Sequence, residues 1–271
     1  MNCVVMCCKV MGTLTSCLLS PASLRPEQAN GEHNGSVSAE DRRHPDEYVE
    51  WFLPRAAEFQ RVLKPEGSFI LNIKENVVDG QRHTYVLALI MALQSQGWLW
   101  TEEYIWHKKN ATPGKWPNRF RDAWERCLHF TKQRKFKMNQ DSVKVPIGDW
   151  AASRLANLSD KDVTRQNSRT GSGMGRCMAN WQGKDKVYPA NVLHIAAECG
   201  NKCHSAAYPV TLPSWFIELF TDAGDVVLDP FSGSGTTGVA ARLIGRSYVG
   251  VDLLECNCSL SEKRWDEAVA K

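Results

Sequence analysis

A glycine-rich segment near the C-terminus holds the residues best suited to chemistry. Residues 226–237 are VVLDPFSGSGTT, and residues 248–252 are YVGVD. Glycines let the backbone turn tightly and approach a ligand, and the helix expected from about Thr236 to Ile244 directs its N-terminus at that ligand. A strand, a glycine turn, a helix and a second strand that ends in an acid form a nucleotide-binding half of an open α/β sheet. The acid, Asp252, can accept hydrogen bonds from ribose hydroxyls.

The glycine-rich string resembles the cofactor motif of S-adenosylmethionine-dependent methyltransferases that act on exocyclic amines of DNA bases, whose usual form is D-P-F-x-G-[ST]-G-T. Its place near the C-terminus is typical of the permuted β class, in which the catalytic half precedes the cofactor half. The resemblance runs from about His44 to Lys271 and implies an α/β fold, a doubly wound mixed sheet of the Rossmann-like type, with S-adenosylmethionine as cofactor. The cofactor-binding residues that it implies are His204, Asp229, Phe231, Gly233, Ser234, Gly235, Thr236, Thr237 and Asp252.

Other segments are similar to further motifs of the same family. Residues 61–73 match its helix end, Pro-Gly turn and sheet strand, and residues 204–209, HSAAYP, resemble its H-P-A-x-[FY]-P segment. Residues 250–265 follow the family's ending, G-[IV]-[DE]-x-x-x-x-Y-x-x-x-[AS]-x-x-R, although Asn257 stands where an aromatic is common. Residues 106–125 match its W-x-K-x-N and R-x-x-x-x-x-E region, and the DNA-binding residues implied there are Lys108, Asn110, Lys115, Arg119 and Arg121.

The catalytic motif of the family is degenerate in this chain. In the family, a [DNS]-P-P-[YFW] tetrapeptide after a strand holds the target amine and stacks on the flipped base, whereas this sequence contains no Pro-Pro pair. The best positional match is Ser20-Pro21-Ala22-Ser23, which makes Ser20 and Pro21 the candidate catalytic residues. A serine at the first position of this tetrapeptide resembles the motif of enzymes that methylate cytosine at N4. We therefore favour cytosine N4 over adenine N6 as the target.

Length and composition suit one large α/β domain with an insert. The chain has 271 residues, of which 43% are hydrophobic and 23% charged. No apolar run reaches the roughly 18 to 20 residues that span a bilayer, so we expect a cytoplasmic protein without a membrane partner. The ten cysteines are expected to be free thiols. No metal is expected, because the cluster of Cys199, Cys203 and His204 lacks paired C-x-x-C spacing.

Positive charge is concentrated in one part of the sequence. Residues 107–186 contain 18 Lys and Arg against 7 acidic residues, a net +11 that leaves the remainder at −8 for a total of +3. Such an excess favours a polyanion, here duplex DNA. We expect four parts: an atypical segment with the degenerate motif at 1–43, a catalytic half at 44–132, a basic target-recognition insert at 133–203 and a cofactor half at 204–271.

The pattern of apolar residues predicts several elements of the catalytic half. A helix is expected from Pro45 to about Leu63, a buried strand at 69–73, and a second helix at 84–96. A strand is expected at 98–106, where Trp98, Trp100, Tyr104 and Trp106 have the same parity and should share one face.

Three functions stay open at this point. The first is a site-specific DNA methyltransferase of a restriction–modification or phage system, with a cognate endonuclease as a further partner. The second is an inactive relative from a disrupted gene that binds DNA or cofactor without turnover, which the degenerate motif and the abrupt join near Arg43 favour. The third is a methyltransferase for RNA or a small amine. The recognition site and the oligomeric state do not follow from the sequence.

Overall fold

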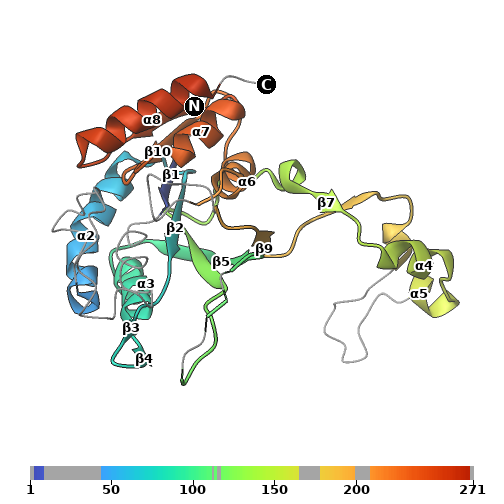
Figure 1. Cartoon of the computed structure of the whole chain (residues 1–271). Helices are drawn as coiled ribbons and strands as arrows, with labels where there is room; N and C mark the ends of the chain where they lie inside the picture. Colours follow the sequence, from blue (N-terminus) through green and yellow to red (C-terminus); the bar gives the residue numbers. More distant parts are fainter. Residues whose placement is uncertain are drawn as a thin grey trace. The chain divides into compact units, whose positions relative to one another are not determined.

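A seven-stranded mixed sheet forms the centre of the larger of two units into which the chain divides. The structure, a computed structural model, describes residues 3–8, 44–111, 113–114, 117–164, 178–198 and 208–268. Unit 1 comprises Met1–Asn139 and Asn191–Lys271, and unit 2 comprises Gln140–Ala190. Figure 1 shows both units in the colours of the sequence.

The sheet of unit 1 contains one antiparallel strand among six parallel ones. Its strands are β1 (Cys3–Cys8), β2 (Ser68–Ile73), β5 (Leu99–Lys108), β6 (Trp124–Thr131), β9 (Val192–Ile195), β10 (Val226–Asp229) and β11 (Ser247–Gly250). Their order is β11-β10-β1-β2-β6-β5-β9, and β6 is antiparallel to both of its neighbours. The predicted doubly wound mixed sheet is thus confirmed.

The inner strand β1, between β10 and β2, comes from the N-terminal segment that looks poorly patterned in the sequence. Val5 is fully buried, opposite Leu228 of β10 on one side and Phe69 of β2 on the other. The sequence alone gave no strand in this place. Six residues offer too little periodicity to be recognised without their partners, which lie far away in the chain.

Two helices, α2 (Pro45–Val62) and α3 (Tyr85–Ser95), lie side by side and cover one face of the sheet (Figure 1). The start of α2 follows from local sequence: Pro45 occupies the first turn, and the His44 side chain accepts a hydrogen bond from the backbone N–H of Asp46 at 3.4 Å. Phe69 of β2 is fully buried at the centre of this face. Its ring packs within 6.4 Å of the rings of Phe52, Phe59, Trp98 and Phe130.

The opposite face carries α6 (Thr211–Phe220), beside α7 (Thr236–Leu243) and α8 (Glu255–Glu267). The prediction that the four aromatics of β5 share one face is wrong. A register shift between Trp100 and Glu102 inserts a bulge and exchanges the faces beyond it. Trp98 therefore packs on Phe69, whereas Tyr104 packs on Phe216 of α6 with ring centroids 5.3 Å apart.

Unit 2 is smaller and has short elements. They are a 3₁₀ helix at Gln140–Val143, the antiparallel pair β7 (Val145–Pro146) and β8 (Lys186–Val187), the helices α4 (Trp150–Ala156) and α5 (Asp160–Thr164), and a 3₁₀ helix at Met178–Trp181. This unit falls within the predicted insert at 133–203, whose recognition role stays a prediction. The flanks belong to unit 1, because Asn139 N–H donates to Leu219 at 2.6 Å and β9 pairs with β5. The Gly-Ser run at 170–175 lies outside the described residues.

Among the described residues, no helix has the length and apolar character needed to cross a bilayer.

Phe69→Ala should lower the free energy of unfolding by about 3–5 kcal/mol, because truncation leaves a cavity under α2. Phe120→Ala is the matched control: that ring is 93% exposed, and its loss should change stability by less than about 0.5 kcal/mol. Urea unfolding of both variants checks this, and similar losses in the two would contradict the core assignment.

Candidate active site

The glycine-rich loop lies where the connections of the sheet diverge. From β10 the chain passes through α7 to the outer strand β11, whereas from β1 it continues through α2 to β2 on the other side. Since β10 and β1 are parallel neighbours, their carboxyl ends share one edge. Open α/β sheets bind ligands outside the carboxyl ends of strands at such a switch point.

The carboxylate of Asp229 organises the loop from beneath. It accepts hydrogen bonds from Phe231 N–H at 3.1 Å and from the Thr237 hydroxyl at 2.6 Å, so it joins the end of β10 to the first turn of α7. The Tyr208 hydroxyl also donates to it at 3.4 Å. Asp229 is fully buried, and burial raises its pKa to about 7 although these hydrogen bonds act in the opposite direction. We therefore assign Asp229 a positioning role rather than direct contact with a ligand.

The glycine at the start of α7 is required by geometry. Gly235 has φ +76°, and a Cβ built there would lie 2.2 Å from the Ser261 hydroxyl oxygen and 2.8 Å from its Cα. One turn further along α8, the Arg264 guanidinium donates to the Ser234 carbonyl at 2.6 Å and to the Ser234 hydroxyl at 2.9 Å. Helix α8 thus holds the loop by close packing and by a cation on its carbonyl.

Asp252 lies directly after β11 and reaches back to the same loop. Its carboxylate accepts hydrogen bonds from Gly233 N–H at 2.8 Å, Leu254 N–H at 2.9 Å and the Asn257 amide at 2.9 Å. Asn257 stands where the family commonly has an aromatic, and here it orients the acid. The flanking Val251 and Leu253 are 51% and 79% exposed, so apolar surface adjoins the acid.

Phe231 links the loop to the other face of the sheet. Its ring lies 5.9 Å from that of Trp51 and 6.3 Å from that of Phe59, both on α2, and it packs against the main core. Ser232 and Ser234 of the loop and Thr236 and Thr237 at the start of α7 are buried. Of the predicted cofactor residues that the structure describes, Gly233 and Asp252 are thus the best placed to face a ligand, while the others shape the loop.

Several predicted residues lie outside the described residues. They are Ser20, Pro21, Lys115 and His204, together with the cysteines 199 and 203. Among the residues that the structure describes, no three His, Cys, Asp or Glu side chains are grouped so as to hold a metal ion. Tyr208 is described, and its hydroxyl donates to the Asp229 carboxylate.

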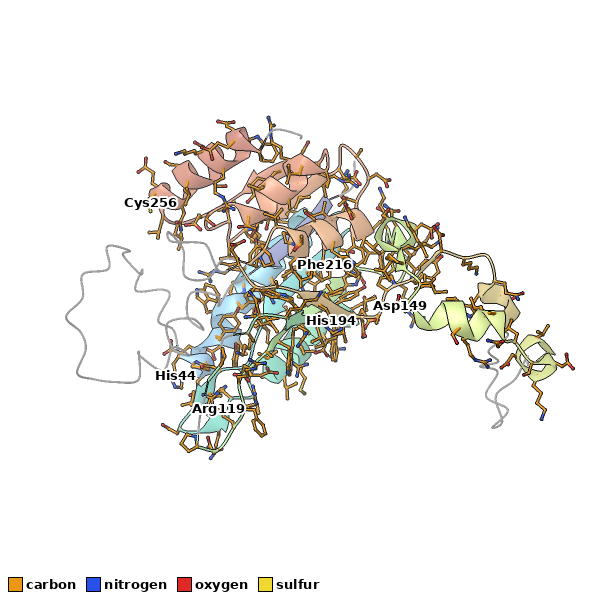
Figure 2. All side chains as sticks on the ribbon, turned by 45° about the vertical axis from the view of Figure 1, so that its right-hand side comes forward. His44, Arg119, Asp149, His194, Phe216 and Cys256 are labelled. Carbon is orange, nitrogen blue, oxygen red and sulfur yellow. The ribbon has the colours of Figure 1, made fainter. Side chains whose placement is uncertain are left out.

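The remaining DNA-binding candidates lie around the connection from β5 to β6, and the structure gives each an internal partner. Lys108 pairs with Glu125 at 2.5 Å, and the Asn110 amide bonds the backbone of Ala197 in both directions. Arg121 donates to the Ala111 carbonyl at 2.9 Å. The guanidinium of Arg119, which is labelled in Figure 2, lies 3.6 Å from the carboxylate of Asp122.

The two units share the basic excess unequally. Of the net +11 found in 107–186, residues 107–139 of unit 1 hold ten Lys and Arg against two acids, and unit 2 holds eight against five. Most of the excess therefore lies on unit 1 rather than on unit 2.

Comparison with known proteins agrees with the geometry of this loop. Residues 30–263 match the family model described as DNA methylase. The chain belongs to this family. The methylase relatives include the type II methyltransferase M.PvuII of Proteus hauseri, 29% identical over 76% of this chain and 67% of that protein. M.SmaI of Serratia marcescens is 25% identical over 86% of this chain and 78% of that one.

Solved structures support the methylase fold. The PvuII DNA methyltransferase, described as cytosine-N4-specific, superposes with a TM-score of 0.62 at 21% identity over 97% of this chain and 79% of that one. The complex of M1.HpyAVI with S-adenosylmethionine superposes with a TM-score of 0.51 at 15% identity. This match covers 98% of this chain and 88% of that one. The match to the DNA methylase model confirms the predicted family and, with it, the predicted cofactor, S-adenosylmethionine.

Gly235→Ala should destabilise the methylase far more than Gly245→Ala. Both glycines have left-handed φ values, but nothing lies within 4 Å of a Cβ at Gly245. We expect a loss of about 1–2 kcal/mol for Gly245→Ala from backbone strain, and a further 1–3 kcal/mol, roughly, for Gly235→Ala from the clash with α8. Thermal and urea unfolding measure the difference, and equal losses would mean that α8 does not pack against the loop in solution.

Replacement of Asp229 by Asn should change the pH dependence of stability. Because the folded pKa lies near 7, above the ordinary 3.8, the folded state retains its proton where the unfolded chain has lost it. The resulting stabilisation is complete at low pH and is lost as pH rises through about 7. The free energy of unfolding of the wild type should therefore rise relative to Asp229→Asn as the pH falls from about 8 to about 5. Parallel pH profiles would show that Asp229 is ionised throughout.

Proposed function

We propose that this methylase transfers a methyl group from S-adenosylmethionine to an exocyclic base amine at specific sites in duplex DNA, with cytosine N4 favoured over adenine N6. The observation that carries the proposal is the loop at the switch point of the sheet, with Gly233 and Asp252 held together at the carboxyl edge. The names of the type II relatives support a DNA substrate and a restriction–modification setting with a cognate endonuclease. We also infer a cytoplasmic location, because that is where such DNA is found.

The residues at this edge fit the cofactor. The Asp252 carboxylate is held by three donors at the edge of the sheet, where it can accept hydrogen bonds from ribose hydroxyls. The exposed side chains of Val251 and Leu253 offer apolar contact for a purine ring beside that acid. S-adenosylmethionine, when bound, supplies a methyl group on a positively charged sulfur.

The protein's part in the reaction is to position the amine. The target base must leave the duplex so that its lone pair points at the methyl group, in line with the bond that breaks. In this proposal Ser20 accepts one amine hydrogen and the backbone around Pro21 accepts the other. Both residues follow β1, whose last residue, Cys8, pairs with Asn72 at the carboxyl edge. β1 thus ends at the same edge of the sheet as β10, which leads into the glycine-rich loop.

A second function has its own support. The chain contains no Pro-Pro pair, and an Ala and a Ser follow Ser20-Pro21 where the family has proline and an aromatic. Loss of the aromatic alone removes about 1–3 kcal/mol of base stacking. A methylase that binds cofactor and DNA without turnover is therefore the alternative.

Transfer of labelled methyl from S-adenosylmethionine to unmethylated genomic DNA tests the proposal. We expect incorporation into DNA and little into RNA, and mass spectrometry of the digested DNA should identify N4-methylcytosine. N6-methyladenine would support transfer and reject the base preference. Saturable cofactor binding without incorporation would support the inactive alternative, and preferential labelling of RNA would reject the DNA substrate.

Asp252→Ala should weaken binding of S-adenosylmethionine by about 10- to 100-fold, the effect of losing hydrogen bonds to a charged group. Asp266→Ala on α8 removes an exposed carboxylate and serves as the matched control, with unchanged affinity. Isothermal titration calorimetry measures both variants. Equal affinities would place the cofactor away from the end of β11.

A further inference from the structure

One side chain on the connection from β5 to β6 stands out by its exposure. Phe120 is 93% exposed, the highest value among the large hydrophobic side chains of the described residues. Water contact of a whole phenyl ring is unfavourable, and burial against a partner removes that cost. The packing of unit 1 leaves this ring in solvent.

The backbone on both sides of this ring is anchored. On one side Arg121 donates to the Ala111 carbonyl at 2.9 Å, which closes the loop on itself. On the other side Arg119 lies 3.6 Å from Asp122. The ring is therefore presented to solvent by a held loop.

Asp122 fastens this loop to the sheet. Its carboxylate lies 3.2 Å from the Lys74 ammonium, directly after β2, and 2.6 Å from the guanidinium of Arg82, in β4 (Gln81–Arg82). Burial acts to raise the pKa of Asp122, but the hydrogen bond from Arg82 and the charge of Lys74 lower it below its ordinary value. The acid is thus a permanent anchor for three cations.

This anchor lies at the same edge of the sheet as the cofactor loop. β2 is parallel to β1, and β1 is parallel to β10, so Lys74, directly after β2, and Asp229, the last residue of β10, lie at one edge. Two strand spacings separate these ends, a distance of about 10 Å. β5 is antiparallel to β6 and β6 to β2, so the loop after Lys108 leaves from this edge as well.

The loop has the charge of a nucleic-acid contact. Residues 109–123 contain four Lys and Arg and one acid, and Phe120 stands between two of the arginines. Cations of this kind attract phosphates, and an aromatic between them can reach the bases. A base that leaves the duplex opens a gap in the stack, and apolar side chains inserted between bases stabilise such a distorted duplex.

We propose that Phe120 is a wedge that enters duplex DNA and stacks in the gap beside the extruded base, with Arg119 and Arg121 holding the loop that presents it. The inference rests on the proposed action on duplex DNA. It assigns the connection from β5 to β6, rather than unit 2, the task of keeping the duplex open.

Competition binding of an intact duplex and the same duplex with one abasic site tests the wedge. Because an abasic site provides the gap, the wild type should bind the abasic duplex more tightly than the intact one. Phe120→Ala should reduce this ratio of affinities by about five-fold or more, since five-fold is the smallest effect expected for one lost stack. Phe120→Trp should retain the preference. Met91→Ala, which removes another exposed apolar side chain, 69% exposed and on α3, should leave it unchanged.

The outcomes separate this inference from the proposed function, because the assay needs no methyl transfer. A wild type that binds neither duplex rejects both proposals. A wild type that shows the Phe120-dependent preference but transfers no methyl group supports the wedge and rejects the transfer. Equal preference in the wild type and Phe120→Ala overturns the wedge, and would point to a protein partner for the ring. Unchanged thermal unfolding of Phe120→Ala confirms that the variant is folded.

Discussion

The methylase depends on one tight corner between β10 and α7. There a buried carboxylate, Asp229, ties the loop to the first turn of the helix, and a left-handed Gly235 lets α8 pack directly on that turn. A Cβ at Gly235 would clash with Ser261 of α8. Because Arg264 and Asp252 bind the same loop from two other elements, the corner joins β10, β11, α7 and α8 into one rigid edge. The geometry offered to the cofactor is set by packing inside the protein.

The features that could be predicted from the sequence are those fixed by neighbours in the chain. The string of residues 226–237 specifies the turn and the helix that follows, and the pattern after Pro45 specifies α2, with Tyr48 and Phe52 on its buried side. The features that could not be predicted depend on residues far apart. β1 is recognisable only between β2 and β10, and the bulge at Trp100 exchanges faces without any glycine or proline to mark it.

The site shows the same division. Ser261 and Arg264 lie at the positions of the small residue and the arginine in the family's ending, so their spacing from Gly250 was a usable signal for the contacts that they make with the loop. No such signal marked Asp122. Its importance comes from Lys74 and Arg82, which precede it by 48 and 40 residues and which only the folding of the sheet brings to it. Likewise, the charge of Lys108 in the sequence did not indicate that this side chain forms an ion pair with Glu125 inside the protein.

The position of β1 in the sheet has a consequence for biosynthesis. Cys3 pairs with Val226, so β1 leaves the ribosome 223 residues before this neighbour does. At usual elongation rates the delay between the two is on the order of ten seconds or more. Pairing with β2 becomes possible much earlier, but the other edge of β1 stays open until β10 emerges, and non-local pairings of this kind form slowly. Nascent chains of the methylase therefore pass through a half-built sheet with an unpaired apolar edge, the kind of intermediate that chaperones protect from aggregation.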